Sequence, residues 1–97
     1  QIVTTFQSKF GPEQWLQPYT VEEVARMAEK GQKNIAVCAP AFSADCIETL
    51  EEINEEIKES FEHAGGEHFN YIPCLNDSEN HITALCNVVS ENLQGWV

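Results

Sequence analysis

The stretch Asn34-Ile35-Ala36-Val37-Cys38-Ala39-Pro40 determines the fold that we expect for this chain. Its central residues are apolar without polar alternation, which is typical of a parallel strand covered on both faces. Proline cannot donate a hydrogen bond to a neighbouring strand, so Pro40 is expected to end the strand. Because parallel strands are joined by crossover helices, the segments on either side are expected to be helical.

Helical patterns do flank this strand. Before it, Thr20-x-x-Glu23 has the form of a capping box, in which both side chains accept from otherwise free backbone N–H groups. Gly31 supplies the C-terminal stop of that helix. After the strand, a helix is predicted from Ser43 or Asp45 to His63, and Gly65-Gly66 closes it.

Two further strands and a last helix complete the predicted order. Residues Ile2 to Gln7 are rich in β-branched side chains, and His68 to Ile72 precede a proline, so both are predicted as strands. Ser78 is expected to cap a helix with one apolar stripe, formed by Ile82, Leu85, Val88 or Val89, and Leu93. Strands alternating with helices predict a single α/β lobe over residues 1–97, with a short parallel sheet.

Composition excludes several classes of partner. A chain of 97 residues has room for one core, either as a small domain or as part of a larger one. The net charge of -11 opposes binding to nucleic acid or to anionic lipid. No apolar run reaches the roughly 20 residues of a membrane span and no secretory signal is present, so a cytoplasmic location is predicted. The abrupt start at Gln1 indicates a cut inside a longer protein.

The four cysteines include no C-x-x-C pair, so a zinc or iron–sulfur site built from them is not expected. Cys38 belongs to the apolar strand pattern and Cys86 to an apolar helical pattern. A reduced thiol in such a pattern behaves as a small core residue. Both side chains are therefore predicted to be buried.

The helix predicted up to His63 has an apolar and an acidic face. On a wheel of about 100° per residue, one stripe contains Ile47, Leu50, Ile53, Ile57 and Phe61. Glutamates fill the opposite arc, and like charges four residues apart cost roughly 0.2–0.5 kcal/mol per pair. One interpretation is a solvated face that begins with a cap formed by Asp45 and Glu48. The other is a ladder of oxygen ligands for a divalent cation, formed by Glu48, Glu52 and Glu56.

Ligands of parallel sheets lie beyond the carboxyl ends of the strands. In this chain the rule indicates three places: the segment after Gln7, the turn from Ala39 to Asp45, and the turn from Pro73 to Ser78. We expect any functional site to be built there.

Segments at two of these places resemble ferrochelatase, the family that inserts ferrous iron into porphyrins. They read Gln7-Ser8-Lys9-Phe10-Gly11-Pro12-x-x-Trp15-Leu16 and Phe42-Ser43-x-Asp45-x-Ile47-Glu48-Thr49-Leu50, the second continuing into Glu52. The resemblance runs on through Tyr71-Ile72-Pro73 and Leu75-Asn76. It implies the C-terminal one of two lobes, each a three-layer Rossmann-like (chelatase-like) unit, that close over a porphyrin cleft. The catalytic histidine would belong to the missing N-terminal lobe, because none of His63, His68 and His81 matches it.

The resemblance also implies roles for individual residues. Glu48 matches the catalytic glutamate and a metal-facing position, and Glu52 and Glu56 match the acidic positions behind it. The predicted substrate-binding residues are Trp15, Phe42 and Asp45, although Trp15 could instead anchor its loop and Asp45 could be only a helix cap. Two positions depart from the family: Cys46 stands where a histidine is common, and Asn54 where an acid can occur.

The expected chemistry follows from charge. Metallation removes two pyrrole protons and strips water from iron, so Glu48 would accept a proton or face the metal, while Glu52 and Glu56 guide iron inward or protons outward. Stacked carboxylates would raise one another's pKa values. Fe²⁺ is a substrate, and no [2Fe–2S] cluster is predicted in this chain. The chain alone is expected to be inactive.

Several alternatives stay open at this stage. The porphyrin would be protoporphyrin IX or coproporphyrin III, and the intact enzyme could touch a membrane peripherally. The same α/β layout would also suit a non-catalytic acidic interaction module, or a chelatase for another tetrapyrrole. Binding of porphyrin or divalent metal by the complete protein would distinguish these classes.

Overall fold

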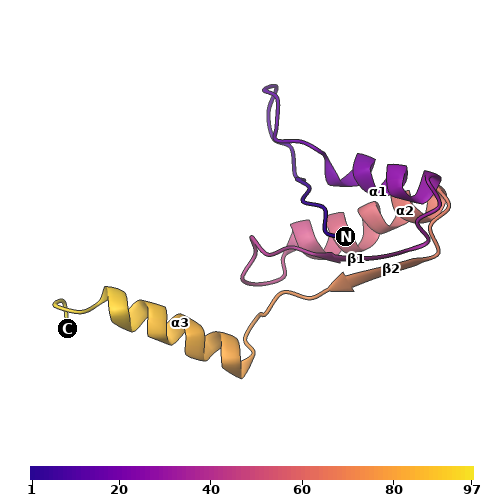
Figure 1. The fold of residues 1–97 in the computed structure, drawn as a ribbon. Helices are drawn as coiled ribbons and strands as arrows, with labels where there is room; N and C mark the ends of the chain where they lie inside the picture. Colours follow the sequence, from indigo (N-terminus) through magenta and orange to yellow (C-terminus); the bar gives the residue numbers. More distant parts are fainter.

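The computed structural model describes all 97 residues. Its elements are α1 (Thr20–Glu29), β1 (Asn34–Cys38), the π-helix η1 (Glu48–Ile57), α2 (Lys58–His63), β2 (His68–Ile72) and α3 (Glu79–Asn92). Strands β1 and β2 form a parallel sheet in which Asn34 pairs with His68 and Cys38 with Ile72. Figure 1 shows α1 and α2 side by side along the sheet, and α3 extending away from this body. The predicted α/β class is confirmed.

The core lies between the helices and one face of the sheet. Its five buried apolar side chains come from α1, η1 and α2, and they are Val24, Ala28, Ile53, Ile57 and Phe61. Alternate strand residues pack against them, among them Phe69, whose ring centroid lies 6.1 Å from that of Phe61. The other strand residues, such as Ala36 and Asn70, are exposed. The expectation that the first of these strands is covered on both faces is therefore wrong for this chain.

The acidic helix differs from the expected α-helix. It begins near Ile47, later than predicted, and Glu48–Ile57 form a π-helix, whose i→i+5 hydrogen bonds close a wider turn. A wider turn holds more than the 3.6 residues of an α-helix. Side chains four apart therefore stay on one line, and the buried series is Thr49, Ile53, Ile57 and Phe61. Ile47 and Leu50 were assigned to the core stripe on an α-helical wheel, but they are 69% and 50% exposed.

Helix α1 forms where predicted but without a capping box. Tyr19 is the N-cap residue and makes no side-chain cap hydrogen bond. The Thr20 hydroxyl donates instead to the Thr5 hydroxyl at 2.8 Å. The Glu23 carboxylate pairs with the Arg26 guanidinium one turn later. The capping box does not form because its two backbone N–H groups have other acceptors: the Thr20 N–H donates to the Phe6 carbonyl at 2.8 Å and the Glu23 N–H to the Tyr19 carbonyl at 3.0 Å.

The N-terminal segment does not form the predicted strand. Only Phe6 makes a single bridge with Tyr19, through hydrogen bonds that join it to the Pro18 carbonyl and the Thr20 N–H. β-Branched residues favour an extended chain, but a strand also needs a partner of similar length. The sheet consists of β1 and β2 alone, and the N-terminal segment does not pair with either strand.

Helix α3 forms where predicted, starting after Ser78, but none of its residues is buried. Ser78 makes no side-chain cap hydrogen bond. The predicted burial of Cys86 is wrong because its helix does not contact the core, and the predicted burial of Cys38 is wrong because it lies on the open face of the sheet. Gly31 and Gly65 end their helices with φ of +94° and +108°, as predicted for C-terminal stops.

Candidate functional site

The turns that follow β1 and β2 meet at the carboxyl edge of the sheet. The Asn76 N–H donates to the Ser43 carbonyl at 3.0 Å, and the Asp45 N–H donates to the Asn76 side-chain oxygen at 2.8 Å. The segment after Gln7 lies against η1, where the Gln7 amide donates to the Glu48 carbonyl at 2.9 Å. All three places expected from the sequence thus adjoin the start of η1.

Asp45 is the most heavily bonded side chain of this edge. Its Oδ1 accepts from the Tyr71 hydroxyl at 2.7 Å and from the Thr49 hydroxyl at 2.9 Å, and its Oδ2 accepts from the Asn76 amide at 2.9 Å. These hydrogen bonds, with that from Tyr71 the largest, hold the pKa of Asp45 well below its usual range. Burial and the bond to Asp45 raise the pKa of Tyr71. Asp45 does not cap the helix, since it receives no N–H of η1.

The three ladder glutamates lie one step apart along η1. Because a π-helix keeps residues four apart near one line, Glu48, Glu52 and Glu56 run along one side of it, each next to a buried residue. Glu48 and Glu52 are half-buried and Glu56 is exposed. No three His, Cys, Asp or Glu side chains gather as a group able to hold a metal ion. The arrangement is therefore a row of separate carboxylates.

Glu48 is the carboxylate nearest the turns. Hydrogen bonding with the Cys46 side chain, and then with its own backbone N–H, lowers the pKa of Glu48. The hypothesis that stacking raises the pKa of these carboxylates is wrong for Glu48, because these hydrogen bonds lower its pKa. Glu48 is thus ionised at neutral pH.

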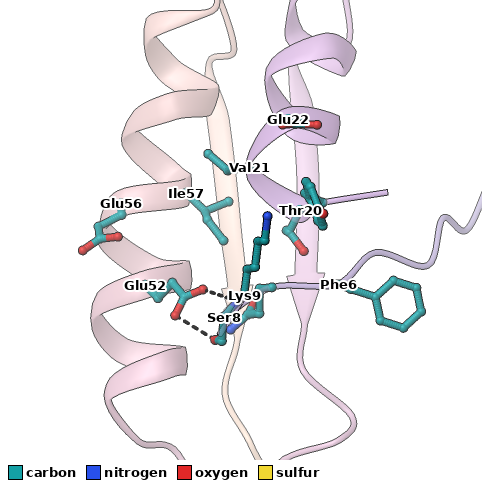
Figure 2. Close-up of a pocket in the computed structure, with 11 residues that line it drawn as sticks. Phe6, Ser8, Lys9, Thr20, Val21, Glu22, Glu52, Glu56 and Ile57 are labelled. Atoms are coloured by element: carbon teal, nitrogen blue, oxygen red, sulfur yellow. Dashed lines mark hydrogen bonds between the residues drawn. The ribbon is translucent and has the colours of Figure 1, made fainter. Parts of the chain in front are cut away.

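Glu52 is bound by the segment after Gln7. The Ser8 N–H and hydroxyl donate to its two carboxylate oxygens, each at 2.8 Å (Figure 2). Ser8 has a φ of +59°, a left-handed conformation that is uncommon for residues other than glycine. The two bonds to Glu52 help to hold this conformation. In the same view the Glu56 side chain points away from Ser8.

A cavity of about 440 Å³ opens between α1, η1 and this segment. Its wall includes the acids Glu22, Glu52 and Glu56 (Figure 2). Lys9 also lines it, and its ammonium lies 5.8 Å from the centroid of the Tyr19 ring. Three carboxylates and one ammonium leave the wall negative, which favours cations over anions.

Two predicted substrate residues lie apart from this cavity. Trp15 is 38% exposed and lines a separate, open depression together with Gln14 and Leu16. Phe42 is half-buried in the turn after β1, where its N–H donates to the Ala39 carbonyl at 3.0 Å. Neither Trp15 nor Phe42 forms a hydrogen bond with Glu48. Their roles stay predictions.

The sequence did not reveal several residues that build the edge. Tyr71, Asn76, Thr49 and Ser8 had no assigned role, although all four lie in segments that resemble ferrochelatase. His81 lies at the base of α3, with its Nδ1 2.6 Å from the Asn76 carbonyl and its Nε2 3.2 Å from the Ser43 hydroxyl. A helical or strand period cannot reveal such contacts, because they join turns that are distant in sequence.

Fold and site together define a class of protein: an α/β lobe with an acidic helix at the carboxyl edge of a parallel sheet. A family model described as "Ferrochelatase" matches residues 1–93. The chain belongs to the ferrochelatase family. No helix combines the length and hydropathy needed to cross a bilayer.

Named relatives agree with this assignment. The ferrochelatase of Rhodobacter capsulatus is 71% identical over 96 residues, covering 99% of this chain and 27% of the relative. Those of Marinobacter nauticus and Allorhizobium ampelinum are 59% and 58% identical, covering 99% and 100% of this chain and 26% and 28% of the relatives. The chain thus spans about a quarter of the length of the curated relatives it matches.

Proposed function

We propose that this chain is the C-terminal lobe of a ferrochelatase, and that the complete enzyme inserts Fe²⁺ into protoporphyrin IX or coproporphyrin III. The observation that carries the proposal is the family match over residues 1–93, with Glu48 and Glu52 on the helix beside the sheet edge. The enzyme would work in the cytoplasm, without a [2Fe–2S] cluster in this chain. The remaining polypeptide would supply the other lobe and the catalytic histidine, so this chain alone would be inactive.

In this proposal Glu48 has a different role from Glu52 and Glu56. Loss of two pyrrole protons needs a base, and dehydration of iron needs oxygen ligands that replace its water. The lowered pKa of Glu48 keeps its carboxylate ionised, which suits a ligand that faces the metal and makes Glu48 a weaker proton acceptor. Glu52 and Glu56 follow at one-step intervals beside the acidic cavity. They would guide iron inward or protons outward.

The predicted substrate contacts belong to the same proposal. Trp15 and Phe42 would meet the macrocycle when the second lobe closes the cleft, since aromatic faces stack favourably on flat rings. Cys46 stands where a histidine is common in the family. A metal contact made by that histidine would be absent here.

Replacing Glu48 in the full-length protein tests this function. We expect Glu48→Gln to lower kcat for iron insertion by about 100-fold or more, within the usual range for a lost general base. Iron incorporation would be measured by absorbance with each porphyrin in turn. Glu55→Gln removes an exposed acid of the same helix and is the matched control, expected to retain activity. Unchanged iron insertion in Glu48→Gln would contradict the assignment.

A further inference from the structure

The hydrogen-bond acceptor sites of the Asp45 carboxylate are occupied by donors within the protein, which leaves few of them for a substrate. Tyr71, Thr49 and the Asn76 amide all donate to it within 2.9 Å, and the Cys74 N–H adds a longer contact of 3.5 Å. These donors come from β2, from η1 and from the turn after β2. A carboxylate has about four lone-pair sites, so these four donors satisfy it inside the protein.

We propose that Asp45 is a positioning residue, which fixes the first turn of η1 against the end of β2 and so orients Glu48 towards the reacting centre. This inference rests on the proposed function. It replaces the expectation that Asp45 contacts the porphyrin. The fully buried Thr49 side chain, one residue after Glu48, is the part of η1 that Asp45 holds.

The connection from Asp45 to Glu48 runs through two residues. The Thr49 hydroxyl donates to Asp45 and accepts from the Cys46 N–H at 2.9 Å. Thr49 and Cys46 flank Glu48 at the start of η1, so their positions fix the backbone from which the Glu48 side chain extends. Moving Asp45 would therefore shift Thr49 and Cys46, and with them the carboxylate that the proposed reaction uses.

A substitution of Tyr71 tests the proposal while leaving Asp45 and the glutamates Glu48, Glu52 and Glu56 unchanged. Its hydroxyl bonds Asp45 and lies 3.5 Å from the Cys74 sulfur, and its ring packs on the core. Tyr71→Phe removes the strongest donor to Asp45 and keeps the ring. In the full-length protein we expect kcat for iron insertion to fall at least fivefold, with the porphyrin KM changed less than twofold.

A double-mutant cycle separates positioning from other effects. If Tyr71 acts through Glu48, Tyr71→Phe should cause no further loss in a Glu48→Gln background, since coupled residues are not additive. Ser60→Ala, which removes an exposed hydroxyl that donates to the Glu56 carbonyl, is the control and should leave kcat unchanged. Additive losses, or a change in porphyrin KM alone, would overturn the proposal.

A conservative pair keeps the proposal testable should Tyr71→Phe fail to fold. Thr49→Ser retains the hydroxyl that bonds Asp45, whereas Thr49→Val retains the shape and loses it. We expect Thr49→Ser to keep kcat near that of the parent and Thr49→Val to lower it as Tyr71→Phe does; equal kcat values for the two would overturn the inference. If Glu48→Gln itself retains full activity, the proposed function fails instead, so the two failures are distinguishable.

Discussion

Asp45 has a lowered pKa in the folded chain, so the free energy of unfolding depends on pH. A carboxylate whose folded pKa lies below its unfolded value, about 3.9, stabilises the fold above that value. The contribution is lost as the pH falls through the folded pKa, because the protonated form loses its strong donors. Asp45→Asn should therefore lower the urea midpoint of this chain at pH 7, and the difference from the parent should shrink below about pH 4.

Chemical denaturation between pH 2 and pH 8 would measure this dependence. Asp77→Asn is the matched control, because Asp77 is an exposed acid near the same turn and accepts no side-chain hydrogen bond. Its midpoint should follow that of the parent at every pH. A difference between Asp45→Asn and the parent that stays constant down to pH 2 would show that the charge of Asp45 does not stabilise the fold.

For individual residues, the sequence predicted which residue types lie near one another but not their hydrogen-bond partners. Glu48, Glu52 and Glu56 were found by spacing, and spacing alone equally allowed a solvated face. The saturation of Asp45 depends on Tyr71 and Asn76, which lie 26 and 31 residues away. Nothing local in the sequence reports such a contact. The family resemblance placed these segments without revealing the bonds between them.

At the junction between α2 and β2, the backbone of Gly66 lies very close to the Phe61 ring. A Cβ added to Gly66 would lie 2.1 Å from Cε1 of Phe61, whose side chain is fully buried. The ring cannot move without disturbing the core. We expect Gly66→Ala to destabilise this chain by about 1–3 kcal/mol, the usual cost of overpacking.

A second substitution identifies the cause. Phe61→Leu removes the ring atoms that a new Cβ would meet, so the double variant Phe61→Leu/Gly66→Ala should be less destabilised than the sum of its single variants. Urea unfolding of the four proteins gives the coupling free energy. Strict additivity would mean that the contact with the Phe61 ring is not the cause of the destabilisation.

Among the elements, helices α1 and α3 and both strands of the sheet were predictable, because apolar period and glycine stops are local signals. The π-helix was not, since it differs from an α-helix by a shift in hydrogen bonding that leaves the composition unchanged. Its effect appears in Ile47 and Leu50, which an α-helical wheel placed in the core. The strand expected at Ile2–Gln7 failed for a different reason: it has no neighbouring strand to pair with.

The whole molecule buries few apolar side chains for its length. Five apolar residues form the core of the 97 present, one face of the two-stranded sheet is open, and α3 contributes no buried residue. Sheets of two strands are marginally stable alone. The relatives carry nearly three quarters of their length outside the matched region. We therefore expect the remaining polypeptide to cover these surfaces.

Helix α3 allows a test of whether the remaining polypeptide covers the exposed apolar surfaces of this chain. On a helical wheel, an exposed stripe of α3 within about 100° contains Ile82, Leu85, Cys86 and Val89, and Leu93 follows at the C-cap. Membrane-surface helices are rich in Lys and Arg, and α3 contains neither; the net charge of -11 also opposes pairing of two copies.

Cys86 lies on this stripe and reports whether the stripe is covered. We expect maleimide to label it at least tenfold faster in the 97-residue chain than in the full-length protein, because only the latter carries the polypeptide that packs on α3. Peptide mapping by mass spectrometry would follow Cys86 alone, with unfolded protein as the reference for full reactivity. Equal rates in both proteins would refute this packing. If labelling of Cys86 in the 97-residue chain slows as the protein concentration rises, a second copy of the chain covers the stripe instead.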